Sequence, residues 1–378
     1  MKIRQGRWTV DAGWQWNASS SARAPNLVLA FGGYRAMTEE RPLEELGRAF
    51  PGVPVVGCST AGEIEGTRVF DDTIVATAIG FEHTRVEVAR VTLEGATDSR
   101  SAGGRLARML AGPGLTHVFV VSEGVRVNGS ELVKGLTSAL PANVAVTGGL
   151  SGDGARMQHT VVYFEGAARP DSVVGIGFYG DRLKVGYGSL GGWDPFGPER
   201  VVTRSEGNIL YELDGLSALS LYKEYLGEQA SELPASALLF PLSIRITPGS
   251  TPVVRTVLGV DEAKGAMVFA GDIPQHAQAQ LMKANFDRLI DGAFDAAKAS
   301  IHGFGNQPAS LAILISCVGR KLILKQRVEE EIESVRDVLG PNVALTGFYS
   351  YGEIAPFTPA AQCELHNQTM TITTLLEV

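Results

Sequence analysis

The sequence has little cysteine, no long apolar run and no concentration of positive charge. Its 378 residues include only Cys58, Cys317 and Cys363, which are odd in number and far apart, so a disulfide framework is not expected and a reducing cytoplasm is. No apolar run approaches the roughly 20 residues that cross a bilayer, and the polar N-terminus lacks the apolar core of a signal peptide. We therefore expect a cytoplasmic protein without membrane insertion.

The charge balance argues against nucleic acid as the main partner. Asp and Glu number 41 against 33 Lys and Arg, which gives a formal net charge of −8, whereas duplex binding draws on clustered basic residues. The hydrophobic fraction of 44% and the charged fraction of 20% are ordinary for a globular chain. This composition and length predict a globular protein of two domains.

The common catalytic motifs are also missing. The Gly-rich segments 59–62 and 148–152 are not followed by Gly-Lys-Ser/Thr, so neither is a P-loop. No G-x-S-x-G elbow and no H-E-x-x-H helix occurs. We expect a protein that is not an enzyme, and an enzyme of unidentified chemistry is kept as an alternative.

The sequence does contain one pattern three times, at residues 27–64, 117–153 and 311–354. Each copy has an apolar strand, a helical stretch, a Pro-led turn, a second apolar strand and a Gly-rich motif. Repetition on this scale indicates that one β-α-β unit was reused. Antiparallel strands are expected after the first two copies, so the predicted fold class is α/β with α+β character and mixed sheets.

Between the copies, the periodicity predicts further elements and a division of the chain. We predict an N-terminal arm over 1–24, a first domain over 25–216 and a second domain over 217–378. Residues 73–81 and 85–91 are predicted to form a hairpin, because both are strand-like and a short turn joins them. A long helix is predicted from about residue 275 to residue 300.

Acidic residues end the three copies, each beside glycine: Glu63, Asp153 and Glu353. Glycine lets a ligand approach the backbone closely, and a carboxylate at a strand end accepts hydrogen bonds from an ammonium group. We select Glu353 as a ligand-binding residue. The alternative is that Glu63 and Glu353 only satisfy backbone amides in a repeated turn.

Four residues near the third copy are further candidates for a ligand site. Tyr349 and Tyr351 flank the Gly-Glu turn and suit a small polar or aromatic ligand, although core packing explains them equally well. Cys317 and Arg320 follow the first strand of the copy, at the carboxyl end where open α/β sheets bind ligands. Arg320 suits a carboxylate, whereas Cys317 is either a functional thiol or a small buried residue.

Two other positions are weighed against a purely structural role. Trp193 and Asp194 lie at the predicted joint between the halves of the chain, and ligand sites favour such joints, although packing for rigidity is the alternative. Cys363 and His366 have a spacing found in metal sites, but on a strand they face opposite sides and no second cluster exists. No metal site is predicted.

Several motifs, in order, resemble the signatures of the FIST sensory proteins. They are Gly-Phe-Tyr-Ser-Tyr-Gly-Glu-Ile-Ala-Pro at 347–356, Glu-Leu-His-Asn-Gln-Thr-Met at 364–370, Gly-Cys-Ser-Thr-Ala-Gly-Glu-Ile at 57–64, and the segments 316–320 and 206–215. The resemblance covers the chain from about residue 25 to its end. It implies an N-terminal and a C-terminal FIST domain that act together as a signal-input module for a small ligand, such as an amino acid or related metabolite.

The resemblance also implies a partner and an alternative cofactor. No kinase or cyclase segment is found in the sequence, so the output is expected to pass through another protein such as a histidine kinase, and a homodimer is left open. Some members of the family are described as haem proteins that sense nitric oxide. In that alternative His366 is the preferred haem ligand, in competition with the five other histidines, and a structural His366 is the simpler reading.

Overall fold

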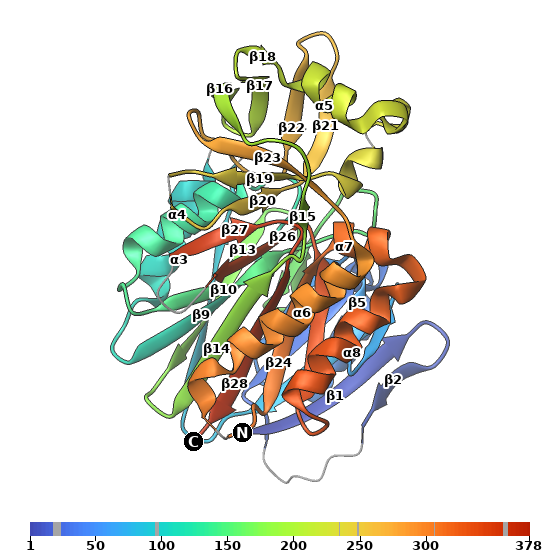
Figure 1. The fold of residues 1–378 in the computed structure, drawn as a ribbon. Coiled ribbons are helices and arrows are strands. Elements are labelled where there is room, and N and C mark those ends of the chain that lie inside the picture. Colours follow the sequence, from blue (N-terminus) through green and yellow to red (C-terminus); the bar gives the residue numbers. More distant parts are fainter. Residues whose placement is uncertain (18–23, 95–97, 234, 248, 306, 358–361) are drawn as a thin grey trace.

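The computed structural model describes residues 1–17, 24–94, 98–233, 235–247, 249–305, 307–357 and 362–378. Figure 1 shows a large body, in which the three repeats form three sheets, and a smaller inserted domain at one end of it. The inserted domain comprises residues 194–284, and the rest of the chain forms the body. Both termini lie at the end of the body opposite to the inserted domain (Figure 1).

Each repeat supplies the centre of one sheet. Two parallel strands and one antiparallel strand form it: β3 (Leu27–Gly33), β4 (Val55–Thr60) and β7 (Ile74–Gly80) in the first sheet; β9 (Leu115–Ser122), β10 (Ala145–Leu150) and β13 (Ser172–Tyr179) in the second; β24 (Leu311–Cys317), β25 (Ala344–Ser350) and β28 (Met370–Glu377) in the third. A strand that precedes each repeat then pairs with the antiparallel one: β1 (Lys2–Thr9), β8 (Arg85–Thr92) and β14 (Leu183–Leu190). At the edge of the first sheet β2 (Gly13–Trp16) pairs with β1, so β2 is the edge strand. The N-terminal arm predicted over 1–24 stays a prediction. The predicted class of mixed sheets with α+β character is confirmed.

The other edge of each sheet is completed by a hairpin from a different repeat. The exchanged hairpins are β5–β6 (Glu63–Glu65 and Arg68–Phe70), β11–β12 (Val162–Phe164 and Ala167–Arg169) and β26–β27 (Gly352–Pro356 and Cys363–His366). The hairpin of the first repeat pairs with β25 of the third, that of the second with β4 of the first, and that of the third with β10 of the second. The exchange is therefore circular.

Glycine occupies the same place in the second strand of every repeat, because the neighbouring parallel strand approaches too closely for a side chain. A Cβ atom on Gly57, Gly148 or Gly347 would lie within 2 Å of a carbonyl oxygen of that neighbour. The strands themselves are continuous apolar runs because both faces are covered, as in parallel sheets generally. This glycine of the Gly-rich motif is thus required by the close packing of the two parallel strands.

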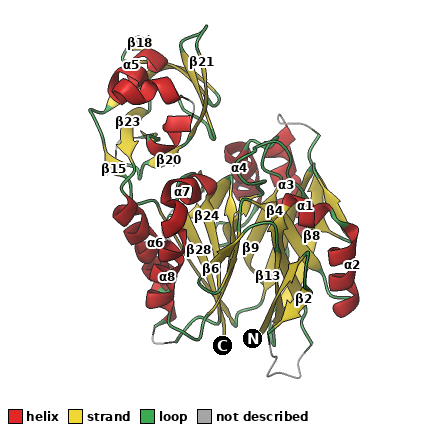
Figure 2. Ribbon diagram, turned by 90° about the vertical axis from the view of Figure 1, so that its right-hand side faces the viewer, coloured by secondary structure: helices red, strands yellow, loops and turns green. Residues whose placement is uncertain are grey.

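The inner faces of the three sheets share one apolar core, to which Phe31, Phe119 and Phe348 contribute from different repeats. Helices cover the outer faces (Figure 2). They are α1 (Tyr34–Thr38) and α2 (Glu40–Ala49) on the first sheet; α3 (Ser99–Leu110) and α4 (Gly129–Ala139) on the second; α6 (Phe286–Ser300), α7 (Val318–Leu324) and α8 (Val328–Leu339) on the third. Short 3₁₀ turns follow α6 and α7, at His302–Phe304 and Lys325–Arg327.

The inserted domain has a separate core and enters the chain between β14 and α6. Its strands are β15 (Asp194–Pro195), β16 (Arg200–Glu206), β17 (Ile209–Leu213), β18 (Leu216–Ser217), β19 (Leu242–Arg245), β20 (Val253–Arg255), β21 (Val257–Asp261), β22 (Ala266–Phe269) and β23 (Gln278–Lys283). Helix α5 (Ala218–Leu226) packs on them and is followed by 3₁₀ turns at Gly227–Glu232 and Ala235–Leu239. The division predicted between residues 216 and 217 falls within β18 and stays a prediction.

The predicted hairpin of residues 73–81 and 85–91 is wrong. Strands form there, as β7 and β8, but they belong to the first and second sheets and pair with other strands. The chain crosses between the sheets at residues 82–84, where the Glu377 carboxylate accepts the backbone N–H groups of all three. Alternation of side chains predicts that a segment is a strand, but it carries no information on which neighbour the strand pairs with.

The predicted helix over 275–300 begins eleven residues too early. Residues Gln278–Lys283 form β23, in which Ala279 and Leu281 alternate into the core of the inserted domain. The helix α6 starts at Phe286, where the Asn285 side chain accepts a hydrogen bond from the Arg288 N–H at 3.4 Å. The Asn cap was the local signal for this start.

Candidate functional site

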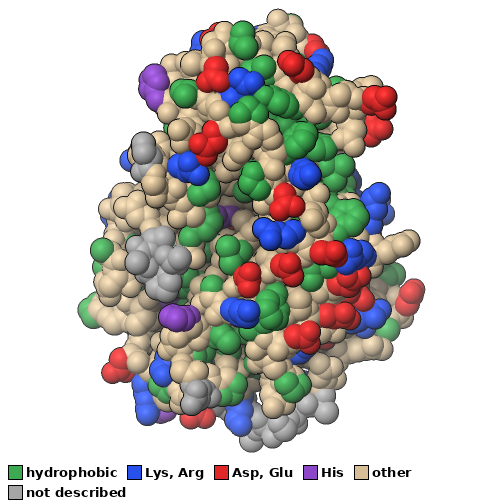
Figure 3. All heavy atoms as spheres, viewed as in Figure 1, with side chains coloured by type: hydrophobic (Ala, Val, Ile, Leu, Met, Phe, Trp, Pro, Cys, Tyr) green, Lys and Arg blue, Asp and Glu red, His purple; other side chains and the backbone are tan. Residues whose placement is uncertain are grey.

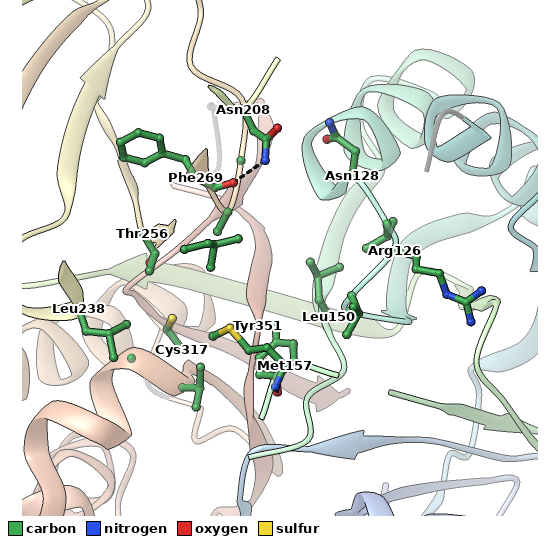
Figure 4. A pocket seen from close by; sticks show the side chains of 18 residues that line it. Arg126, Asn128, Leu150, Met157, Asn208, Leu238, Thr256, Phe269, Cys317 and Tyr351 are labelled. Carbon is green, nitrogen blue, oxygen red and sulfur yellow. Dashed lines mark hydrogen bonds between the residues drawn. The ribbon is translucent and has the colours of Figure 1, made fainter. Parts of the chain in front are cut away.

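A cleft of about 600 Å³ lies between the inserted domain and the body, beside two of the sequence-predicted residues. Figure 4 shows its two walls, one from the second repeat and one from the inserted domain, with Cys317, Met157 and Tyr351 below them. Its lining residues are Gly124, Val125, Arg126, Val127, Asn128, Leu150, Met157, Asn208, Leu238, Thr256, Leu258, Phe269, Ala270, Gly271, Cys317, Val318, Gly319 and Tyr351. The carboxyl ends of β9 and β24 reach this cleft, which is the usual place for a ligand site in an α/β sheet.

The wall from the second repeat is held by Glu123, which directly follows β9. Its carboxylate accepts the N–H groups of Val125 at 3.0 Å and Arg126 at 2.7 Å, while burial raises its pKa. Gly124 allows this loop to pass the Ser151 carbonyl, which would lie 1.9 Å from a Cβ atom. Sequence reasoning missed Glu123, although it stands at the strand end where the third repeat has Cys317.

Two of the sequence-predicted residues, Cys317 and Tyr351, line the cleft. Cys317 ends β24 and is 3% exposed, and burial is the main cause that raises the pKa of its thiol. The Tyr351 hydroxyl donates to the Asp153 carboxylate and accepts the Met157 N–H at 3.0 Å. Burial, with the hydrogen bond to Asp153, raises the pKa of Tyr351. Tyr351 thereby connects the third repeat to the loop after β10.

Glu353 is fully buried and does not line the cleft. Its carboxylate accepts hydrogen bonds from the Ser350 hydroxyl at 2.6 Å and from the hydroxyl and N–H of Thr369 at 3.0 and 3.3 Å. Burial raises its pKa to about 8. These contacts are of the kind expected in the alternative, in which Glu353 stabilises a turn. Its role as a ligand-binding residue stays a prediction.

Glu63 repeats this arrangement in the first repeat. It accepts from the Thr60 hydroxyl at 2.5 Å and from the hydroxyl and N–H of Thr73 at 2.8 and 3.1 Å. Burial raises its pKa to about 7. Two carboxyls with matching partners in two repeats indicate a shared scaffold element.

Arg320 and Tyr349 meet at a third buried carboxylate, that of Glu331 on α8. Arg320 Nε and Nη2 donate to Glu331 Oε2 at 3.0 and 2.8 Å, and Tyr349 Oη donates to Glu331 Oε1 at 2.6 Å. Arg320 also donates to the carbonyls of Gly191 and Leu289. Neither side chain lines the cleft, and burial raises the pKa of Tyr349 well above its ordinary value. The structure therefore separates Tyr349 from Tyr351, which binds a different carboxylate.

Trp193 and Asp194 lie where the chain enters the inserted domain. Trp193 is 7% exposed, and its indole Nε1 donates to the Gln368 carbonyl at 2.8 Å. Asp194 forms an ion pair with Arg288 at 3.3 Å, at the start of α6. Neither residue lines the cleft; both lie at the junction between the body and the inserted domain.

His366 is buried on β27. Its Nε2 lies 2.7 Å from the Ala355 carbonyl, and its ring packs edge-on against Phe357 with centroids 4.2 Å apart. Burial lowers its pKa to about 4, so the imidazole is neutral. Cys363 Sγ instead contacts the Val146 carbonyl at 3.3 Å. Among the described residues, no three histidine, cysteine or acidic side chains gather as they would around a metal ion.

The wall from the inserted domain was not predicted from the sequence. It includes Leu238, Thr256, Leu258 and Phe269, which are ordinary core and strand residues in a linear reading. Asn208, whose amide donates to the Phe269 carbonyl at 2.7 Å, lies in the segment 206–215 that carries part of the family resemblance. Within the described residues, none of the helices has the length and apolar character that crossing a membrane would require.

Comparison with known proteins gives a family assignment. The FIST N domain model matches residues 26–216, and the FIST C domain model matches residues 218–356. No curated protein matches the chain. FIST domains are associated with the sensing of small ligands in signal transduction. The two matches cover most of the chain in the expected order, and the protein therefore belongs to the FIST family.

Proposed function

We propose that the protein is a cytoplasmic sensor that binds a small molecule in the cleft and signals through a separate partner, such as a histidine kinase. The observation that carries this proposal is the position of the cleft, whose walls come from two parts of the chain with separate cores. Domain interfaces are preferred ligand sites, and volumes of about 300–1,000 Å³ are usual for them.

A ligand in this cleft would act on the contacts that hold the inserted domain against the body. Asp272 accepts hydrogen bonds from Asn128 and Lys134 of the second repeat, both at 3.1 Å. Arg255, 2% exposed on β20, donates to the Leu365 carbonyl at 2.8 Å. A ligand shifts the arrangement only by as much as its affinity differs between the two arrangements. A ligand that strengthens or weakens the contacts of Asp272 and Arg255 beside the cleft would have a different affinity for each arrangement.

A non-catalytic role is favoured by the protonation of the Cys317 thiol, which lines the cleft. Cys317 is buried, and its raised pKa keeps the thiol protonated at neutral pH, whereas a catalytic cysteine is activated by a lowered pKa. All three cysteines are free, which is compatible with a reducing cytoplasm.

The charged surface supports a partner other than nucleic acid. Figure 3 shows acidic and basic side chains interspersed over α6 and α8. Several form ion pairs, such as Arg327 with Asp287 at 2.8 Å. Duplex binding uses a stripe of basic side chains instead, and this face carries none.

The surroundings of His366 do not fit an axial haem ligand. A ligating imidazole needs one ring nitrogen free to reach iron in an open cavity. Here Nε2 is engaged by the Ala355 carbonyl, Nδ1 is buried, and the residue does not line the cleft. The ligand proposal therefore rests on the cleft and not on this histidine.

Hydrogen–deuterium exchange with a stabilising metabolite tests the proposal. A library is first screened for compounds that raise the melting temperature of the full chain. A compound that binds as proposed will slow exchange in both walls, at residues 124–128 and 256–271. Protection of one wall alone, or only of segments outside the cleft, would contradict a bridging ligand.

A further inference from the structure

The described lining residues of the cleft include a single charged side chain, Arg126. Its guanidinium donates to the Pro170 carbonyl at 3.3 Å and points away from the cleft in Figure 4. For a zwitterionic ligand, the described lining has no carboxylate to pair with an ammonium group, and its one cation, Arg126, is directed away from the cleft. Burial of an unpaired charge is strongly unfavourable.

Three carboxylates that neighbour the lining segments in sequence or through a hydrogen bond are already engaged. Glu123 accepts two backbone N–H groups of its own loop, and Asp153 accepts the Tyr351 hydroxyl. Asp272, next to the lining residue Gly271, accepts from Asn128 and Lys134. None of these three carboxylates is itself a lining group, so an ammonium group in the cleft would find no carboxylate within the described lining.

Apolar side chains, by contrast, line the cleft from three different parts of the chain. Leu150 belongs to the second repeat, Phe269 to the inserted domain and Val318 to the third repeat. Three large apolar side chains that line it are exposed, namely Val125 at 42%, Met157 at 37% and Leu258 at 43%. They come from separate segments, so their exposure at one place is a property of the folded cleft and indicates a ligand with an apolar body.

One polar side chain of the lining lacks a hydrogen bond. Thr256 is 4% exposed, and its hydroxyl has no partner among the described residues. Other polar side chains at the cleft are engaged: Asn208 donates to Phe269, and the Tyr351 hydroxyl binds Asp153. A buried hydroxyl without a partner is unfavourable, so a ligand that supplies one neutral hydrogen-bonding group, once the Thr256 side chain turns toward the cleft, gains affinity there.

We infer that the ligand of this cleft is an uncharged, largely apolar small molecule with a hydrogen-bonding group that pairs with Thr256, and not a free amino acid. The inference rests on the proposed function, because it assumes that the cleft is the ligand site. It differs from the amino acid that the family resemblance implies, because the described lining has no carboxylate for an ammonium group and its one cation, Arg126, is directed away from the cleft.

Four probes with one ring system test the inference on the full chain by equilibrium dialysis. They are 2-naphthol, 2-methylnaphthalene, 2-naphthoate and the zwitterion 3-(2-naphthyl)alanine. We expect 2-naphthol to bind several-fold more tightly than 2-methylnaphthalene, and the two charged probes to bind at least tenfold more weakly than 2-naphthol. In Thr256→Val, which keeps the side-chain shape, the advantage of 2-naphthol over 2-methylnaphthalene is expected to disappear.

A matched pair of variants shows whether the probes occupy the cleft. Leu258→Asp places a carboxylate at the cleft and is expected to weaken 2-naphthol binding at least tenfold. Leu216→Asp changes another exposed leucine of the inserted domain, outside the cleft, and should leave binding unchanged. Both side chains are exposed, so neither change should prevent folding.

The outcomes separate the inference from the proposed function. Charged probes that bind as tightly as 2-naphthol, in a manner that depends on Leu258, would overturn the inference and leave the cleft as a ligand site. An advantage of 2-naphthol that persists in Thr256→Val would remove Thr256 from the inference. If no probe binds in a manner that depends on Leu258, the inference and the proposed ligand site both fail.

Discussion

Replacement of Glu353 by Gln is expected to stabilise the protein at alkaline pH and to have little effect in acid. The buried carboxyl has a pKa of about 8 in the folded protein, against an ordinary value of 4.5. Below pH 4.5 it is neutral in both folded and unfolded chains. Above that pH the unfolded chain loses the proton and the folded protein keeps it, so stability falls as pH rises toward the folded pKa.

The magnitude follows from the size of the shift. One pKa unit corresponds to about 1.4 kcal/mol, so the rise from 4.5 to about 8 corresponds to roughly 5 kcal/mol of stability lost once both states are ionised. Between about pH 5 and pH 8, the Gln variant should gain about 3–4 kcal/mol relative to the wild type. The amide fits the site, because its oxygen can accept from Thr369 while its nitrogen donates to Ser350.

Urea unfolding of both proteins across this pH range measures the difference. Other buried groups, such as His117 and His366, titrate with the opposite sign, but they are common to both proteins and cancel. Glu333→Gln, exposed on α8, is a control that should show no such gain. A difference that does not change with pH would refute the reasoning, as would a variant that becomes relatively less stable as pH rises.

Three further predictions concern the body. Glu331→Gln leaves the buried Arg320 guanidinium without its carboxylate and should cost about 3–5 kcal/mol in urea unfolding, whereas a loss below about 1 kcal/mol would show that the pair is not buried as described. Gly347→Ala places a Cβ atom 1.8 Å from the Leu314 carbonyl and should destabilise the fold by about 3 kcal/mol or more, which a normal melting temperature would disprove. Cys317 should react slowly with a thiol reagent in the native protein at neutral pH and fully in denaturant, because its pKa is raised, and rapid native labelling would contradict this.

The repeated unit could be predicted from the sequence, but the pairing of its hairpins could not. Apolar strands, Pro-led turns and the glycines at 57, 148 and 347 all recur at fixed places, because each repeat meets the same packing constraints. Partner choice depends on how three sheets enclose one core, and the local pattern of a hairpin is the same whichever sheet it joins. The hairpin predicted for residues 73–91 was wrong for a related reason, because β7 and β8 join different sheets and the local pattern of a strand does not specify its partner.

For the candidate site, the sequence indicated one part of the cleft. Cys317 was found because it stands at the carboxyl end of a strand, and Tyr351 because it flanks the Gly-Glu turn; both line the cleft. Leu258 and Thr256 were missed because their role arises only when the inserted domain lies over the body. Arg320, which carries a strong chemical signal in the sequence, is instead bound to the buried Glu331 carboxylate on α8 and does not line the cleft. Whether Arg320 contacts a ligand stays a prediction.

The circular exchange of hairpins makes the order of synthesis matter for the body. The second sheet lacks the strands β26 and β27 until the last part of the chain, residues 352–366, has left the ribosome. The first repeat likewise waits for residues 162–169 before its sheet is complete. The arrangement is that of a hairpin-swapped trimer whose three subunits have become one polypeptide. No repeat can therefore be excised as an independent folding unit, and the body closes only when its final hairpin is in place.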